Sequence, residues 1–127
     1  MATYLFDTNI IIRVLNGTTI SPAGLSILVD ATNDFLFSVA SLWEMQIKVT
    51  LSKLQLALPI ADIARELARQ RVQDQRLGVK HIVRLEQLPP HHGDPFDCLL
   101  VAQAIEREVR LLSTDQKLST YPNTLIV

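Results

Sequence analysis

The chain has 127 residues, 48% of them hydrophobic and 20% charged, with a formal net charge of −1 at pH 7. This composition excludes an intrinsically disordered chain, and a domain of this length buries roughly two thirds of its unfolded surface, enough for a core without disulfides. No apolar run approaches the ~20 residues that span a membrane, and Asp7 interrupts the N-terminal apolar stretch where a signal peptide would continue. We therefore expect a single domain over residues 1–127 that is soluble and cytoplasmic, without membrane contact.

The first half of the chain alternates short apolar runs, which favour strands, with longer segments that begin at helix-starting residues. Gly17 ends the first helix, and the helix that begins at Ser21-Pro22 is expected to bury Leu25, Leu28 and Val29. The predicted elements are a strand over Ala2–Phe6, a helix over Ile10–Leu15, a helix from Ser21 to about Thr32, a strand over Asp34–Ser38, and a helix that Ser38 or Ser41 caps and that runs to about Leu51.

The second half continues this alternation of helices and strands. The segment Val72–Leu77 is polar, so a strand there would lie at the edge of the sheet. Strands that alternate with helices imply right-handed crossovers and a mostly parallel sheet covered on both faces. The predicted elements are helices over Pro59–Arg71 and Gly78–Leu88, a helix from Pro95, a strand over Val109–Ser113, a short helical turn from Asp115, and a strand over Leu125–Val127.

The segment Pro89–Ala104 contains a strong helix start. Asp94 takes the N-cap position before a proline, Asp97 takes the third helical position, and the apolar run that follows is expected to be buried. Asp97 therefore lies where free amides and the helix dipole favour negative charge. Cys98, the single cysteine, is expected to be a small core residue. In the preceding loop, His91-His92 are expected to make loop or partner contacts rather than to bind metal.

Four acidic residues are expected to gather at one edge of the sheet. Asp7, Asp97 and Asp115 lie at strand ends or helix starts, and the carboxyl ends of parallel strands form the crevice where open α/β sheets bind ligands. Glu44 interrupts the apolar start of a helix, where a buried charge needs a partner. Each acid has an ordinary structural alternative, because the aspartates can be helix caps and Glu44 can pair with Lys48 four residues on.

Carboxylates gathered in one crevice repel each other and raise each other's pKa values unless a cation neutralises them. Oxygen ligands without cysteine or a spaced histidine pair select a hard divalent cation, so Mg²⁺ or Mn²⁺ is the expected cofactor. Such an ion keeps open water positions, takes phosphate oxygens as ligands and lowers the pKa of a bound water. The chemistry that follows is metal-assisted hydrolysis of a phosphodiester.

Basic residues are concentrated in one segment, because six of the twelve fall within positions 65–84, which contain only two acids. One interpretation is that they form a wall of a phosphate-binding groove. The other is a solvated helix face on which the arginines make surface pairs with Asp62 and Glu66.

Four motifs together resemble the PIN-domain ribonucleases and, more narrowly, the VapC-type toxins of bacterial type II toxin–antitoxin pairs. They are FDTN at 6–9, SLWE at 41–44, DPFD at 94–97 followed by LLVAQA at 99–104, and STD at 113–115. The resemblance implies a three-layer α/β/α sandwich, a homodimer and an antitoxin protein as partner. It also implies a Mg²⁺- or Mn²⁺-dependent endoribonuclease that cleaves RNA by means of an activated water.

The resemblance further implies roles for individual residues. Asp7, Glu44, Asp97 and Asp115 would be the catalytic, metal-binding quartet. Thr8, Asn9 and Thr114 would orient the carboxylates or a metal-bound water. Within the basic segment, the candidate RNA contacts are Arg65, Arg69, Arg76 and Lys80. Gly93 and Cys98 stand where many relatives carry arginine, so contacts made by those arginines are not carried over to this chain.

Three other classes of protein offer alternative interpretations. A phosphatase of the haloacid-dehalogenase type needs a second acid two residues after the first, whereas position 9 is Asn9. A receiver-type phosphoacceptor domain needs an aspartate at the end of a central strand, and residues 45–61 contain none. The remaining alternative is a catalytically inactive PIN fold that only binds RNA or a partner.

Overall fold

The computed structural model describes residues 1–89 and 93–127, so the predicted roles of His91 and His92 fall outside the described residues. Five strands form one sheet in the order β3-β2-β1-β4-β5, and each neighbouring pair is parallel. This confirms the predicted α/β class with a parallel central sheet. The strands are β1 (Thr3–Phe6), β2 (Asp34–Ser38), β3 (Val72–Gln75), β4 (Arg110–Ser113) and β5 (Thr124–Ile126).

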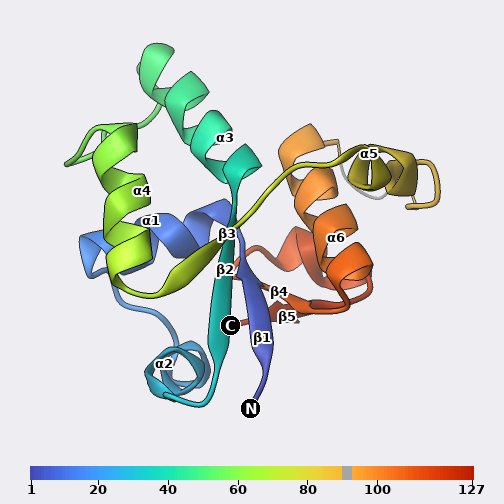
Figure 1. Ribbon diagram of the computed structural model, residues 1–127, viewed down its shortest axis with the longest axis horizontal. Helices are drawn as coiled ribbons and strands as arrows, with labels where there is room; N and C mark the ends of the chain where they lie inside the picture. The colour runs from blue at the N-terminus through green and yellow to red at the C-terminus, as the bar shows by residue number, and fades with distance from the viewer. Residues whose placement is uncertain (90–92) are drawn as a thin grey trace.

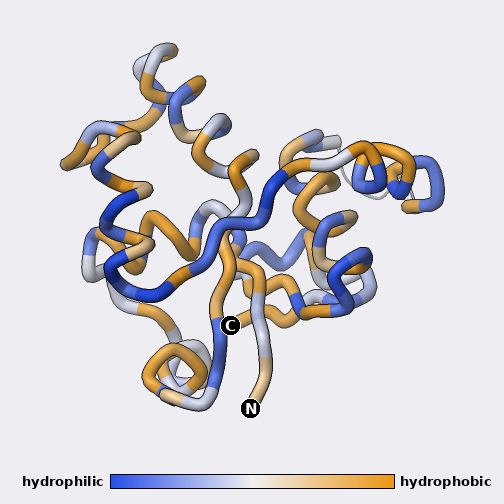
Figure 2. The backbone as a smooth tube through the Cα atoms, viewed as in Figure 1, coloured by the Kyte–Doolittle hydropathy of each residue, from blue (hydrophilic) through white to orange (hydrophobic). Residues whose placement is uncertain are grey.

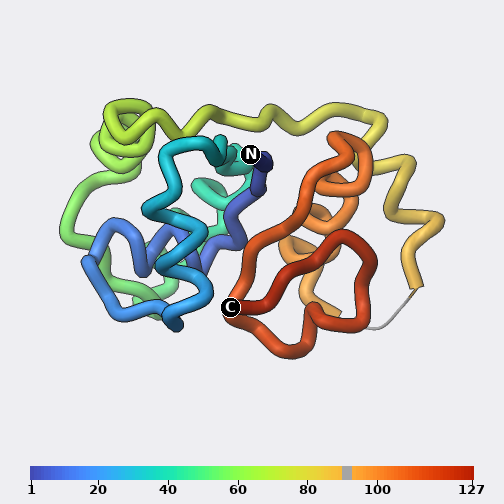
Figure 3. The backbone as a smooth tube through the Cα atoms, turned by 90° about the horizontal axis from the view of Figure 1, so that it is seen from below, coloured from blue at the N-terminus to red at the C-terminus, as the bar shows by residue number. Residues whose placement is uncertain are grey.

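Helices cover both faces of the sheet, as the α/β/α prediction requires. Helices α1, α2 and α4 lie on one side of the strands, α5 and α6 lie on the other, and α3 extends beyond the end of β2 (Figure 1). Figure 3, seen at right angles, shows the same separation, with the chain crossing between the sides after α4. The helices are α1 (Thr8–Asn16), α2 (Pro22–Val29), α3 (Val39–Thr50), α4 (Ile60–Arg69), α5 (Val79–Leu85), α6 (Pro95–Arg107) and the 3-10 helix η1 (Gln116–Thr120).

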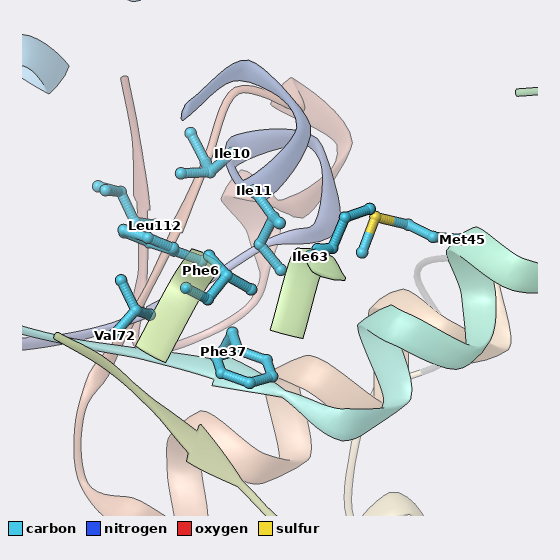
Figure 4. Close-up of a cluster of buried hydrophobic side chains, with 9 residues drawn as sticks. Phe6, Ile10, Ile11, Phe37, Met45, Ile63, Val72 and Leu112 are labelled. Atoms are coloured by element: carbon cyan, nitrogen blue, oxygen red, sulfur yellow. The ribbon is translucent and has the colours of Figure 1, made fainter. Parts of the chain in front are cut away.

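Adjacent residues on the three central strands enter opposite hydrophobic clusters, because successive strand side chains point to opposite faces. One cluster packs against α1, α3 and α4 (Figure 4), and the other packs against α6 and η1. These buried positions are hydrophobic on both faces for this reason, and Figure 2 shows an orange stretch within each of β1 and β2 near the middle of the molecule. The pairs are Leu5 and Phe6 on β1, Leu36 and Phe37 on β2, and Leu111 and Leu112 on β4.

Helix starts follow the predicted capping residues. Ser21 accepts a hydrogen bond from the amide of Gly24, and Asp94 caps α6 at the amides of Phe96 and Asp97. For α3, the sequence left either Ser38 or Ser41 as the cap. The cap is Ser38, whose hydroxyl accepts a hydrogen bond from the Ala40 amide. Because these caps use residues close in sequence, local chemistry suffices to predict them.

Helix α1 begins at Thr8, two residues earlier than predicted, with Asp7 as its N-cap. Gly17, in the left-handed conformation with φ of 65°, ends it as predicted, and its amide donates to the carbonyl of Arg13.

The prediction that α2 runs to about Thr32 and buries Leu25 and Val29 is wrong. The helix ends at Val29, and the residues Leu25 and Val29 are 54% and 71% exposed. Asp30 accepts hydrogen bonds from the amide and hydroxyl of Thr32, which favour a turn over another helical turn. Gly24 is the buried residue of α2, where a β-carbon would collide with Ile20. Since α2 is apolar nearly all round, hydrophobic periodicity could not identify the buried face.

The polar segment after α4 does form an edge strand, β3, although it ends at Gln75 rather than Leu77. Helix α5 is likewise shorter than predicted and leaves Val79, Ile82 and Val83 exposed. Cys98 is partly buried against the α6 cluster, with its Sγ 3.7 Å from the Tyr121 hydroxyl. In the parts of the chain that the structure describes, no helix is both long and apolar enough to cross a bilayer.

Candidate active site

Asp7 occupies the end of the central strand, where β1 passes directly into α1. The residue is 2% exposed, and its carboxylate is held from two sides. Oδ1 accepts a hydrogen bond from the Thr8 amide at 2.8 Å, and Oδ2 accepts one from the Ser113 hydroxyl at 2.6 Å. The Asp7 amide donates to the carbonyl of Leu112 at 2.9 Å, which ties the residue to β4. The position and rotamer of this buried acid are therefore set by two strands and a helix start.

The pKa of Asp7 is raised from 3.8 to about 6, chiefly because the carboxylate is buried. The negative charges of Asp97 and Glu44 raise the pKa further, whereas the hydrogen bonds from Ser113 and Thr8 lower it. Carboxylates affect each other in this way only when they lie near one another. The fold thus brings three of the four predicted acids into one electrostatically coupled group.

Glu44 lies in the first half of α3 and is 4% exposed. Its Oε1 accepts a hydrogen bond from the Thr8 hydroxyl at 2.7 Å, and its Oε2 accepts one from the Lys48 ammonium at 2.7 Å. Thr8 Oγ1 also lies 3.0 Å from the Ser41 hydroxyl. The Glu44–Lys48 pair, one of the two interpretations of the sequence, is therefore present, and Glu44 remains part of the acidic group.

Lys48 carries positive charge into this group. Its pKa is raised first by the hydrogen bond to Glu44 and further by the negative charges of Glu44, Asp94 and Asp97. The ammonium is thus electrostatically coupled to acids on both α3 and the start of α6.

The other two predicted acids belong to helix starts. Asp97 is a buried residue in the first turn of α6, next to the Asp94 cap. Asp115 is partly exposed and caps η1 by accepting from the Lys117 amide at 3.0 Å. Its own amide donates to the Ser113 hydroxyl at 3.0 Å, so Ser113 links the backbone of Asp115 to the carboxylate of Asp7.

Within residues 1–89 and 93–127, no three or more His, Cys, Asp or Glu side chains are grouped so that they could hold a metal together. Hydrogen bonds already engage Asp7, Glu44 and Asp115, as described above. Of the residues predicted to orient the acids, Thr8 contacts Glu44, Asn9 is exposed and Thr114 is partly exposed.

Ser113 and Lys48 contact the acids Asp7 and Glu44, and Ser41 contacts the Thr8 hydroxyl, although the sequence prediction gave none of the three a role at the site. Ser113 is a polar residue at the end of the apolar run of β4, and that position was the signal available for it. Lys48 was predicted as a helical partner of Glu44, and the electrostatic effect of Asp97 on it comes from the fold. Trp43, next to Glu44, is 58% exposed, and its ring centroid lies 5.2 Å from that of Phe96.

The basic segment forms surface pairs in this structure, as the second interpretation of it proposed. Arg65 pairs with Asp62, and the Nε of Arg69 lies 2.9 Å from Glu66. Arg76 pairs with Asp74 at the surface, Arg84 forms a half-buried pair with Glu106, and Lys80 is exposed. The candidate RNA contacts thus lie at the surface rather than in the acidic group.

The sequence model of the PIN domain matches residues 4–123, nearly the whole chain. The chain belongs to the PIN domain family. No curated protein matches its sequence.

Solved structures similar to this PIN domain include chains of bacterial toxin–antitoxin complexes. VapBC2 from Rickettsia felis, bound to a DNA fragment from its promoter, is 20% identical with a TM-score of 0.69 over 98% of this chain and 97% of that one. DNA-bound VapBC from Salmonella typhimurium is 13% identical with a TM-score of 0.68 over 100% and 98%. A toxin–antitoxin complex from Klebsiella pneumoniae is 16% identical with a TM-score of 0.61 over 96% and 95%. At these identities the likeness is one of fold.

Ser113→Ala is expected to destabilise this PIN domain by about 2 kcal/mol at pH 8, because a buried carboxylate loses a charge-assisted hydrogen bond. The pKa of Asp7 should rise further in the variant, since the Ser113 hydroxyl lowers it in the wild type. Urea unfolding and NMR titration of the carboxyl carbons measure the two effects. Ser119→Ala removes an exposed hydroxyl that bonds its own helix and is the control. Equal losses of stability in both variants would contradict the role of Ser113.

Proposed function

We propose that this PIN domain is a Mg²⁺- or Mn²⁺-dependent endoribonuclease, a single-domain VapC-type toxin of a type II toxin–antitoxin pair that acts in the cytoplasm. The observation that carries the proposal is the coupled acidic group, in which Asp97 and Glu44 raise the pKa of buried Asp7. Negative carboxylates that are buried close together raise the free energy of the folded protein, and a bound cation would offset this cost by neutralising them. The similar solved structures include chains of VapBC complexes, which supports a VapC-type toxin rather than another kind of PIN-domain protein.

Asp7 and Asp97 are the residues proposed to hold the metal, with Glu44 and Asp115 completing the quartet. The donors are all carboxylate oxygens, which suit Mg²⁺ and Mn²⁺. Mg²⁺ commonly keeps several waters and uses only one or two protein carboxylates, so the chemistry of the donors fits this ion without a preassembled group of three. When bound, the ion supplies a water of lowered pKa and positive charge for the phosphate oxygens.

The chain's own residues would orient the acids. Thr8 and Ser113 hold the two oxygens of Asp7 in fixed directions, and Thr8 also holds Glu44. Asn9 and Thr114 would orient a carboxylate or a metal-bound water from the same edge of the sheet. Because Asp7 and Glu44 are almost fully buried, the site would keep bulk water away from the carboxylates.

Partners follow from the same proposal. An antitoxin would cover the acidic site. The exposed basic side chains of residues 65–84 would bind RNA phosphates after their surface ion pairs with acidic residues open. Exposed pairs of this kind are worth less than about 1 kcal/mol, so they are no obstacle to binding. A homodimer would bury exposed apolar side chains, among which are Val79, Ile82 and Val83 on α5.

The test is cleavage of structured and single-stranded RNAs, tRNA included, by the purified protein free of antitoxin. Cleavage is expected with Mg²⁺ or Mn²⁺ and is expected to cease in EDTA. If no RNA is cut with either metal by a folded preparation that still binds RNA or partner, the catalytic proposal fails. The inactive binding module, which the lack of a three-ligand group among the described residues favours, would then replace it.

A further inference from the structure

Lys48 reaches from the last turn of α3 into the acidic group. Its side chain is 44% exposed, whereas the side chain of its partner Glu44 is 5% exposed. The ammonium therefore enters from solvent and ends 2.7 Å from an oxygen that is almost fully buried. The Coulomb attraction between a buried carboxylate and a cation at the mouth of its site is stronger than that in a surface ion pair, because solvent screens it less.

Both oxygens of Glu44 have partners in this arrangement, since Thr8 binds one and Lys48 the other. A carboxylate held from both sides must give up or share a partner before it can bind a metal directly. The charge of Lys48 is also coupled to Asp94 and Asp97 at the start of α6. The basic residues Arg65, Arg69, Arg76 and Arg84, by contrast, pair with acids outside the site.

We propose that Lys48 is a positioning residue that holds Glu44 and places a resident positive charge in the acidic site, where it competes with the divalent cation and lowers the affinity of the site for metal. The inference rests on the proposed function, because it takes the acids to be the metal site. A fixed positive charge beside a metal site repels the incoming ion, and its pairing with Glu44 removes a carboxylate from the available ligands. When no metal is bound, the same positive charge reduces the repulsion between the buried carboxylates and so stabilises the folded protein.

The experiment is Mn²⁺ titration of the full-length protein by calorimetry, with the electron paramagnetic resonance signal of free Mn²⁺ as a second readout and no RNA present. Lys48→Met is expected to bind Mn²⁺ at least tenfold more tightly than wild type, and Lys48→Arg to bind within about threefold of wild type. Lys53→Met removes the same charge from an exposed position just beyond α3, so no change is expected there. If Lys48 only supported the structure of the site, its removal would lower the affinity for Mn²⁺. An increase in affinity therefore identifies competition between Lys48 and the metal.

A second comparison avoids the unpaired buried charge that Lys48→Met leaves on Glu44. Glu44→Gln keeps an acceptor for Thr8 and is expected to weaken Mn²⁺ binding about tenfold, since the charge of Lys48 then faces Asp97 without the neutralising charge of Glu44. Glu44→Gln combined with Lys48→Met should bind at least tenfold more tightly than Glu44→Gln alone. Thermal unfolding in EDTA shows which variants are folded, and the double variant decides the question if Lys48→Met is not.

The outcomes separate this inference from the proposed function. If wild type binds Mn²⁺, Asp7→Asn loses that binding, and removal of Lys48 leaves the affinity unchanged or weaker, then the metal site stands and the competition is refuted. If neither wild type nor the Lys48 variants bind Mn²⁺, both proposals are refuted.

Discussion

Asp7→Asn is expected to abolish metal-dependent RNA cleavage while making the metal-free protein more stable. Asparagine retains an oxygen for the Thr8 amide but lacks the negative charge proposed to hold the ion. Loss of that charge should remove several kcal/mol of transition-state stabilisation, which corresponds to roughly 10³-fold in rate. Asparagine is as good an N-cap as aspartate, so α1 should keep its start.

The gain in stability follows from the raised pKa of Asp7. Because the pKa is about 6 in the folded protein and 3.8 ordinarily, the folded state holds a proton that the unfolded state loses as pH rises through this window. Stability therefore falls between about pH 4 and pH 6, by about 3 kcal/mol for the full shift, and remains lower above pH 6. The amide side chain of the variant cannot ionise, so Asp7→Asn should lack this fall and exceed wild type in stability at pH 7.

Urea unfolding in EDTA from pH 4 to pH 8 measures the stability, and the RNA panel measures the rate. Asp30→Asn is the control, because hydrogen bonds from Thr32 lower the pKa of that exposed carboxylate and no stabilisation is expected. Wild-type cleavage by Asp7→Asn would refute the role of Asp7 at the metal site. A variant no more stable than wild type at pH 7 would show that Asp7 is not strained by burial.

Phe6→Ala is expected to cost about 4 kcal/mol of unfolding free energy, the range for a fully buried phenylalanine being about 3–5 kcal/mol. Phe6 is 1% exposed on the central strand and lies in the α1–α3–α4 cluster (Figure 4). Its ring stacks on that of Phe35, with the ring centroids 5.1 Å apart. Its removal would leave a cavity beneath three helices and directly beside Asp7. For a domain of this size, such a loss lowers the melting temperature by more than about 10 °C.

Chemical denaturation of Phe6→Ala checks this value, with Val79→Ala as the control. Val79 is 80% exposed on α5, so its truncation should change stability by less than about 0.5 kcal/mol. A loss below about 2 kcal/mol for Phe6→Ala would mean that the cluster relaxes around the cavity. A large loss for Val79→Ala would instead indicate that the apolar face of α5 is covered, as in the proposed homodimer.

Sequence patterns predicted most of what is local in this PIN domain. The caps at Ser21 and Asp94 and the left-handed Gly17 follow from side chains and backbone within three residues of each helix end. The alternation of apolar strands and helices predicted the parallel sheet, because strands buried on both faces need crossover helices. Topology then placed Asp7 at the end of the central strand. The order of the elements thus predicted that Asp7 would lie at this edge of the sheet before any contact was known.

How the acids are held depends on contacts between distant parts of the chain. The Ser113 hydroxyl binds Asp7 from 106 residues away, and Thr8 reaches Glu44 from 36 residues away, so no local pattern contains either contact. The buried face of α2 was likewise undetermined, because a helix that is apolar nearly all round offers several faces and packing selects one. The order of residues along the chain specifies which side chains carry charge and near which strand ends they fall. Long-range packing specifies which of those charges are buried, which are paired, and that Lys48 lies among them.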